Sequence, residues 1–280
     1  MSRLVRKAVM RAWRMVAPKK ARNSLRLWMM LDIPDFAPRL IEEFTDAPVI
    51  VLAPHMDDEV IGPGGTVVQH LKAKAKMTFV LMTDGRAGDP AARVSMAETR
   101  KNETRRAAEM LGVNDVVFLD GPDGALDDTP EIVSALEKII VQRGAAIIYA
   151  PGVTDHHRDH WATNRILRKT LDRLPEKVTK NLVIRGYEVW TPLPANRMSD
   201  ISDVVEIKRQ CIEAFASQTR LIDYARTILG LNQYRSMVHL CGRGYAEAFL
   251  ETTVEEYRRL FDEISLRKPF EEADPSAAKI

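Results

Sequence analysis

The sequence predicts an α/β fold, in which a single Rossmann-like domain with a mostly parallel sheet flanked by helices leads into a helical C-terminal part. Three observations predict it. Short β-rich runs alternate with helical stretches from Ala47 onward. The 280 residues contain no internal repeat, and this length suits one large domain. Apolar residues make up 45% and charged residues 29%, which excludes global disorder and allows a core without disulfides.

Strands are expected where a short apolar, β-rich run is bounded by turn residues. These runs span residues 48–53, 77–82, 116–119, 145–150 and 182–189. Because helical stretches separate them, consecutive strands would be parallel, and helices would cover both faces of the sheet.

Helices are expected in residues 65–76, 93–111, 130–142 and 159–174. Gly112 would end the second of these as a C′ residue. Thr129 would cap the third, with Pro130 in its first turn. From about Glu206 onward the chain is predicted to be mainly helical.

The predicted organisation has three parts. Residues 1–46 form a basic amphipathic arm and linker, residues 47–264 the domain, and residues 265–280 a polar tail. Residues 1–31 hold nine basic and no acidic side chains, whereas the rest of the chain, with 32 basic against 39 acidic residues, has a net charge of −7. A mildly acidic body is not typical of a nucleic-acid-binding domain, so no nucleic-acid partner is expected.

Residues 3–16 of the arm would form an amphipathic helix that ends at Pro18. Such a helix packs on its own domain, packs on a second copy in a homo-oligomer, or makes a peripheral contact with an anionic membrane surface. The sequence leaves these alternatives open. It shows no membrane span and no secretory signal, so we expect a cytoplasmic protein, with attachment at the inner membrane surface as the open alternative.

Two clusters of histidine and acidic residues follow predicted strands. Residues 54–59 read Pro-His-Met-Asp-Asp-Glu, and residues 155–160 read Asp-His-His-Arg-Asp-His. In open parallel sheets, ligands bind at the carboxyl ends of the strands. We therefore expect the two clusters to meet at one edge of the sheet.

The residue types in these clusters point to a metal. Crowded carboxylates repel one another, and a divalent cation removes that repulsion. Histidine nitrogens and carboxylate oxygens without thiolates suit Zn²⁺, with Fe²⁺, Co²⁺ or Mn²⁺ as alternatives. Three protein ligands leave a position for water, which is typical of a catalytic site. The pattern predicts a hydrolytic metal centre.

Together with residues 54–59, the segments Gly64-Gly65-Thr66 and His157-Arg-Asp-His160 resemble the N-acetylglucosaminyl-phosphatidylinositol/LmbE-like (PIG-L) deacetylase family. Arg100-Lys-Asn-Glu103 and Gly244-Tyr-Ala-Glu-Ala-Phe249 agree with it. The resemblance covers about residues 47–250.

The resemblance implies a set of metal ligands, namely His55, Asp58 and His160. Asp57 would be the general base that takes a proton from the metal-activated water. A protonated His157 would support the oxyanion or the leaving amine. Asp159 would orient His157 or one of the ligand histidines.

Two further residues, Arg100 and Asp123, match family positions that contact hydroxyl or phosphate groups of the substrate. Their alternative roles are a charge on a helix face and a turn residue, respectively. The chain departs from the family pattern where Met56 and Arg158 replace prolines and where Asp155 replaces a tyrosine of some members. His156 is expected to be a hydrogen-bonded loop histidine.

The predicted function is zinc-dependent removal of the N-acetyl group from an N-acetylglucosamine-like amino sugar, in a glycan, a glycoconjugate, or an antibiotic or thiol precursor. The substrate would be a small molecule or a lipid-linked sugar. Two alternatives stay open: an amidase of the same family that acts on a larger acyl group or a thiol conjugate, and a non-catalytic, metal-binding module attached to a membrane.

Overall fold

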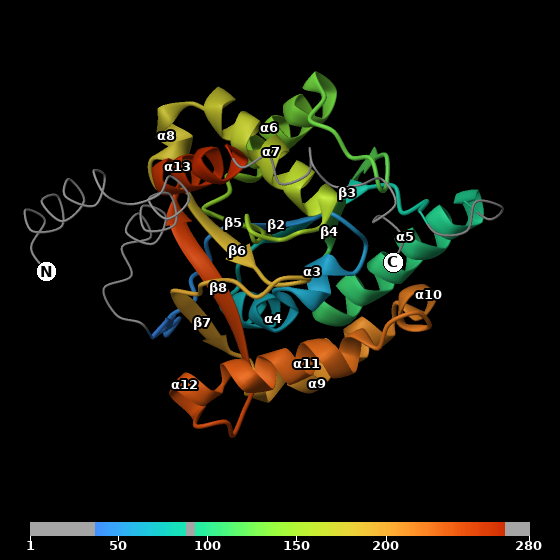
Figure 1. Ribbon diagram of the computed structural model, residues 1–280, viewed down its shortest axis with the longest axis vertical. Coiled ribbons are helices and arrows are strands. Elements are labelled where there is room, and N and C mark those ends of the chain that lie inside the picture. Colours follow the sequence, from blue (N-terminus) through green and yellow to red (C-terminus); the bar gives the residue numbers. More distant parts are fainter. Residues whose placement is uncertain (1–36, 88–92, 267–280) are drawn as a thin grey trace, which may run out of the picture.

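A mixed eight-stranded sheet lies between two layers of helices in the computed structural model, which describes residues 37–87 and 93–266 (Figure 1). The predicted helix over residues 3–16 lies outside the described residues. The strand order is β1-β7-β8-β6-β5-β2-β3-β4. The strands are β1 (Arg39–Leu40), β2 (Val49–Ala53), β3 (Met77–Thr83), β4 (Asp115–Gly121), β5 (Ile147–Pro151), β6 (Val183–Tyr187), β7 (Arg197–Asp200) and β8 (Ala246–Thr253). Neighbouring strands are parallel except where β8 pairs with β6 and β7.

Each face of the sheet is covered by its own layer of helices. The α7 layer consists of α6 (Pro130–Arg143), α7 (Arg158–Arg173) and α13 (Val254–Ser265), and the short α8 (Glu176–Thr179) follows α7. The α4 layer consists of α3 (Asp58–Ile61), α4 (Gly64–Lys72), α5 (Arg93–Leu111), α9 (Val205–Glu213) and α11 (Tyr224–Arg235). Short elements extend the α4 layer: η1 (Ser202–Val204), α10 (Ala216–Thr219) and α12 (Met237–Leu240).

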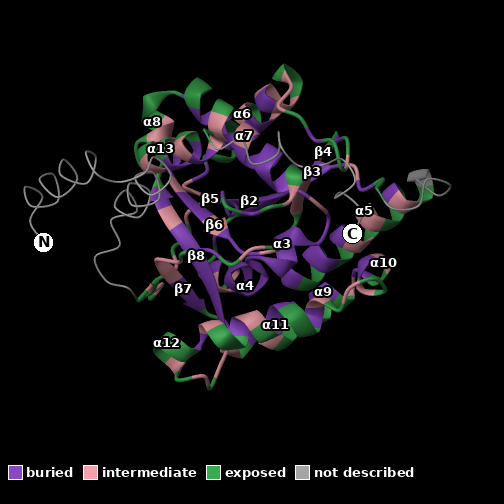
Figure 2. Cartoon of the chain, viewed as in Figure 1, coloured by how far each residue is buried: buried purple, intermediate pink, exposed green. Residues whose placement is uncertain are grey.

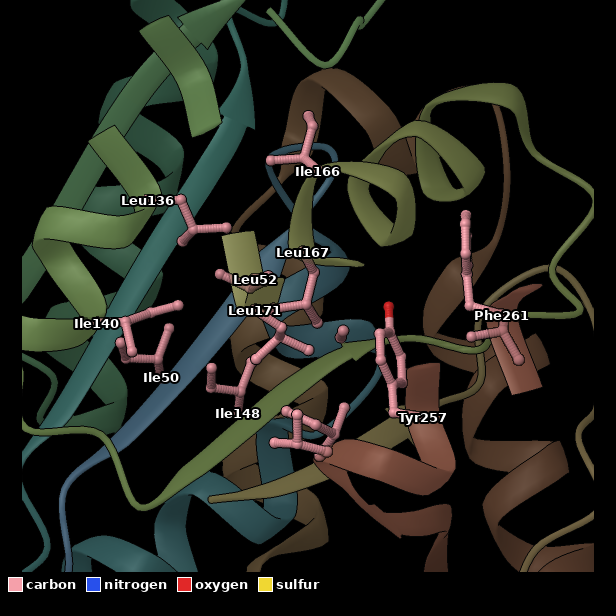
Figure 3. Close-up of a cluster of buried hydrophobic side chains, with 14 of the residues drawn as sticks. Ile50, Leu52, Leu136, Ile140, Ile148, Ile166, Leu167, Leu171, Tyr257 and Phe261 are labelled. Carbon is pink, nitrogen blue, oxygen red and sulfur yellow. The ribbon is translucent and has the colours of Figure 1, made fainter. Parts of the chain in front are cut away.

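Alternation along the strands divides the core in two. In β2, Ile50 and Leu52 join the α7-layer cluster, whereas Val49 and Val51 join the α4-layer cluster. Figure 3 shows the α7-layer cluster, where side chains of β2 and β5 lie near those of the covering helices. Because both faces are covered, the strands are apolar on both sides, as the sequence predicts. The predicted α/β fold class is confirmed.

Two predicted helix ends are confirmed. The Thr129 hydroxyl accepts a hydrogen bond from the Ile132 backbone N–H at 3.4 Å, and Pro130 opens α6. Gly112 follows α5 with φ +91°, a conformation that favours glycine.

The predicted helical C-terminal part is confirmed for α9, α11 and α13, but the structure corrects one segment of it. Residues 246–253 form β8, an antiparallel strand between β6 and β7. Most of β8 is buried (Figure 2). Its sequence, Ala-Glu-Ala-Phe-Leu-Glu-Thr-Thr, has a weak local preference for a strand, so pairing on both sides decides its conformation.

The structure also adds two short strands that the sequence did not predict, β1 and β7. They pair in parallel through Arg39 with Arg197 and Leu40 with Met198, so the chain joins the sheet before residue 47. None of the described helices combines the length and apolarity of a membrane-spanning segment.

Candidate active site

The two predicted clusters lie at the carboxyl ends of adjacent strands. His55 follows β2, and residues 155–160 follow β5, which pairs with β2. Asp123 follows β4. The structure therefore brings together residues 104 positions apart in the chain, with His55 Nε2 and Asp159 Oδ2 at 3.0 Å.

Two of the predicted metal ligands, His55 and His160, lie close to one carboxylate oxygen of the third, Asp58. Asp58 Oδ2 lies 3.3 Å from His55 Nδ1 and 3.2 Å from His160 Nε2. Two ligand atoms that bind one tetrahedral zinc ion at about 2.0–2.1 Å stand roughly 3.3 Å apart. Asp58 is 2% and His160 0% exposed, so water does not stabilise these charges. These two distances match those expected between ligand atoms of a shared divalent cation. Nitrogens of His55, His157 and His160 also lie within 4.8 Å of one another.

The second nitrogen of each proposed ligand histidine faces its own buried carboxylate. His55 Nε2 donates to Asp159 Oδ2, and His160 Nδ1 lies 3.3 Å from Asp155 Oδ2. Such a carboxylate fixes the ring orientation of a metal-binding histidine and raises its basicity. Of the two roles predicted for Asp159, the structure shows the contact of its side chain with a predicted ligand histidine, His55.

Asp155 is a functional candidate that the sequence interpretation missed. Besides facing His160, its Oδ1 accepts from the His157 backbone N–H at 2.9 Å, and its Oδ2 accepts from the Trp190 backbone N–H at 3.2 Å. Asp155 is 5% exposed. Its position two residues before His157 was noted only as a departure from the family pattern. The signal available in the sequence was an acidic residue at the start of the cluster at residues 155–160.

Asp57 occupies an unusual backbone conformation directly beside the proposed ligands. Its φ of 136° is rare for a residue with a side chain. Its backbone N–H donates to Glu59 Oε2 at 3.0 Å, which helps to hold this conformation. Strained backbone of this kind concentrates at functional sites, where the surrounding structure maintains it.

Protonation in the site responds to burial and crowding. Burial, together with the neighbouring Asp58 carboxylate, raises the pKa of Asp57 to about 8. Burial also disfavours charge on His160, but contacts with Asp58 and Asp155 outweigh it and raise the pKa of His160 to about 9. The pKa of His55 is raised as well, by Asp159 and Asp58 against the opposing effect of burial. The centre of the site therefore favours positive charge, which a divalent cation supplies in place of protons.

His157 differs from its predicted protonated form. Burial, with His55 and His160 beside it, lowers the pKa of His157 to about 4. Its Nδ1 accepts a hydrogen bond from the Asp159 backbone N–H at 3.2 Å, which caps α7. A neutral ring with its proton on Nε2 satisfies both observations.

The two predicted substrate contacts lie next to each other. Arg100 Nη1 is 3.2 Å from Asp123 Oδ2, and Asp123 Oδ1 is 3.5 Å from His55 Nε2. Asp123 also accepts from the Ala87 backbone N–H at 2.9 Å. Arg100 donates to Gln218, a neighbour that the sequence gave no signal for. This polar group borders the proposed metal ligands.

The other histidines lie outside this cluster. His156 is exposed, and its Nδ1 is 2.9 Å from the Thr191 hydroxyl, which confirms a hydrogen-bonded loop histidine. His70 is buried in α4 against the Tyr149 hydroxyl at 2.9 Å.

Comparison with known proteins gives matches over this part of the chain. Residues 50–171 match the family model described as GlcNAc-PI de-N-acetylase (PIG-L). The chain is 29% identical over 198 residues to diacetylchitobiose deacetylase of Thermococcus kodakarensis, covering 64% of this chain and 73% of that one. It is 26% identical over 186 residues to a probable N-acetyl-alpha-D-glucosaminyl L-malate deacetylase 2 of Bacillus anthracis, covering 61% and 80%. The structure of N,N'-diacetylchitobiose deacetylase from Pyrococcus horikoshii shares the fold, with a TM-score of 0.65 at 24% identity over 86% of this chain and 96% of that one.

Proposed function

We propose that this chain, whose residues 50–171 match the PIG-L (LmbE-like) deacetylase family model, is a zinc-dependent hydrolase that removes the acetyl group from an N-acetylglucosamine-like sugar. One observation carries the proposal. His55 and His160 both contact the Asp58 carboxylate, and Asp58 directly follows the buried Asp57, whose backbone is strained. A purely structural metal site does not require such a base.

Under this proposal, His55, Asp58 and His160 hold the metal, and Asp159 and Asp155 orient the two rings. When bound, the ion polarises the amide carbonyl and makes a water molecule more acidic. Fe²⁺, Co²⁺ and Mn²⁺ suit the same nitrogen and oxygen ligands, so the choice among these ions belongs to the test below.

Asp57 takes the proton of the attacking water as the water oxygen bonds to the acetyl carbon. A nearby cation favours the ionised form of Asp57, which offsets the rise in its pKa from burial. His157 donates a hydrogen bond from Nε2 to the carbonyl oxygen as negative charge develops there. When the C–N bond breaks, the proton held by Asp57 passes to the leaving nitrogen. The products are acetate and a free amine on the sugar.

Arg100 and Asp123 are proposed to bind hydroxyl groups of the sugar. Asp123 accepts hydrogen bonds and Arg100 donates them, and both lie beside His55. This combination suits a sugar, whose hydroxyls both donate and accept.

The test is a screen of acetylated amino sugars that are free, nucleotide-linked or lipid-linked, with release of acetate as the readout. Longer acyl groups in the same screen distinguish the amidase alternative. Asp57→Asn should retain the metal and lose about 10²- to 10⁴-fold in kcat. His160→Ala should lose most of its bound zinc. A chain that binds zinc but releases no acyl group from any compound would instead be a non-catalytic binding module.

Packing and membrane contact both remain open as roles of the N-terminal arm. Its nine basic residues favour contact with an anionic membrane surface, and its apolar stripe favours packing on the domain or on a second copy. Sedimentation with anionic vesicles at low and high salt, for the full chain and a chain without residues 1–31, distinguishes these roles. Binding that depends on the arm and weakens with salt supports the membrane contact.

A further inference from the structure

An aromatic pair borders the proposed catalytic centre on the side of His157. Trp190 follows β6, and Tyr224 begins α11. Their ring centroids are 6.2 Å apart and the rings are inclined by 76°, an edge-to-face contact. Tyr224 is partly buried, whereas Trp190 remains 37% exposed. Nothing in the proposed reaction uses this pair.

Trp190 is one ring contact away from the proposed catalytic groups. Its ring lies 6.2 Å from that of His157, with the two planes inclined by only 19°. His157 in turn lies 4.7 Å from His55 and 5.0 Å from His160 between ring centroids. A molecule whose reacting amide contacts His157 therefore has Trp190 within reach.

Trp190 is held in place independently of its indole ring. Its backbone N–H donates to Asp155 Oδ2, the carboxylate that also faces His160. The edge of Tyr224 and the ring of His157 restrict the indole further. A large, exposed aromatic side chain with so little freedom loses little entropy when a ligand packs on it.

The chemistry on the two sides of the centre differs. Arg100 and Asp123 offer charge and hydrogen bonds, whereas Trp190 and Tyr224 offer aromatic surface. A pyranose ring matches both, because its C–H groups form an apolar face and its hydroxyls lie around its edge. Binding sites commonly combine an apolar wall with a few polar groups that set the orientation.

We propose that Trp190, supported by Tyr224, binds the apolar face of the pyranose ring that carries the acetamido group. This inference rests on the proposed function and names the residue through which the chain would favour a sugar ring over an acyclic acetamide. Trp190 is then a substrate-binding residue that discriminates by ring shape.

The test compares two substrates, the methyl glycoside of N-acetylglucosamine and acyclic N-acetylethanolamine, by steady-state release of acetate. Trp190→Ala should raise KM for the glycoside on the order of tenfold with little change in kcat, and leave the acyclic substrate unaffected. Trp190→Phe keeps an aromatic face and should restore most of the loss. Tyr234→Ala, which removes another exposed aromatic residue at the far end of α11, is the matched control and should change neither parameter.

Other outcomes identify which proposal is wrong. If Trp190→Ala lowers kcat for both substrates equally, the indole only supports His157 and binds no sugar. If the wild-type chain releases acetate from neither substrate, the proposed function fails for them, and binding of the same glycoside, measured by isothermal titration calorimetry, still tests the subsite. Binding that is lost in Trp190→Ala supports it, and the absence of binding to the wild type overturns it.

Discussion

Two helices carry the proposed catalytic residues, and the protein fixes them by different means. α7 has 16 residues, and its first turn contains Asp159 and His160. α3 has four residues, Asp58–Ile61, and follows Asp57. The long helix is held mainly by apolar packing along its length. The short helix is held by a buried ion pair that comes from distant parts of the chain.

The anchoring of α7 is visible in the core of its layer (Figure 3). Ile166, Leu167 and Leu171 are fully buried in that cluster. The contacts extend over several turns and hold the body of α7. Hydrogen bonds add to them in the first turn, where His157 caps the helix and Asp159 accepts from the backbone N–H groups of Gly124 and Leu126.

The anchoring of α3 is polar. Lys208 Nζ donates to the Gly62 carbonyl at 3.1 Å and lies 2.6 Å from Glu247 Oε1. Glu247 accepts from the backbone N–H groups of Gly65 and Thr66 at 2.7 and 2.8 Å, at the start of α4. Lys208 and Glu247 are 0% and 2% exposed. A helix of one turn offers only Val60 and Ile61 for apolar packing. The comparison teaches that hydrogen bonds and an ion pair can fix a helix that is too short to be held by apolar packing.

The largest expected effect comes from breaking this polar anchor. Lys208→Met leaves Glu247 buried without its cation, so the free energy of unfolding should fall by about 3–5 kcal/mol. Zinc should also bind more weakly, because the turn after α3 loses a contact. Urea unfolding of the metal-free protein and zinc titration measure the two effects. Lys208→Met with Glu247→Gln removes the unpaired charge and should regain part of the stability. A single variant with unchanged stability and zinc affinity would contradict this account.

The matched change in the α7 layer should affect stability alone. Leu171→Ala removes a fully buried side chain far from the first turn of α7. The free energy of unfolding should fall by about 2–5 kcal/mol, because a cavity remains. Zinc affinity measured on the folded variant should equal that of the wild type. A loss of zinc affinity in Leu171→Ala would show that the site depends on apolar packing as much as on the ion pair of Lys208 and Glu247.

A smaller effect is expected where Asp155 meets α7. Asp155→Asn keeps the size of the side chain but weakens its contact with His160 Nδ1. Zinc affinity should fall by about 10- to 100-fold. Asp159→Asn, which changes the partner of His55, should lower it to a similar extent. Zinc titration against a competing chelator compares the two, and wild-type affinity in either variant would remove that carboxylate from the metal centre.

The smallest effect concerns pH and the buried His70 of α4. Burial, with the positive charge of Arg185, lowers the pKa of His70 to about 3. Its pKa in the unfolded chain is about 6.5, so the unfolded state binds the proton first as the pH falls. The stabilisation is complete above about pH 6.5 and is lost progressively toward pH 3. Between pH 7.5 and 5.5 this loss is about 1 kcal/mol.

His70→Gln should remove that part of the pH dependence, because glutamine does not titrate. Urea unfolding of the metal-free wild type and variant at both pH values isolates the contribution of His70 from those of other histidines. Equal pH dependence in the two proteins would show that His70 is protonated to the same degree in both states.

The residues that sequence reasoning found are those whose signal is local. The clusters at 54–59 and 155–160 each lie within six positions, and each follows a strand that apolar runs make recognisable. The order of strands and helices from β2 to β6, apart from the short helices α3 and α8, follows from the same runs.

The residues that it missed depend on contacts across the chain. β8 contains alanine and glutamate, which favour helices, and becomes a strand only because β6 and β7 flank it. Glu247 meets Gly65 across 182 positions. Trp190 and Asp155 meet through a backbone hydrogen bond that no spacing predicts.

The buried ion pair has a consequence for the order in which the protein is made. Lys208 and Glu247 belong to the later part of the chain, whereas every proposed metal ligand precedes residue 161. A nascent chain that extends through α7 therefore contains all of the proposed metal ligands before Lys208 and Glu247, which contact the turn between α3 and α4, have been synthesised. The turn is fixed only when β8 enters the sheet between β6 and β7. The residues proposed to hold the metal are therefore synthesised before the ion pair that fixes the neighbouring turn.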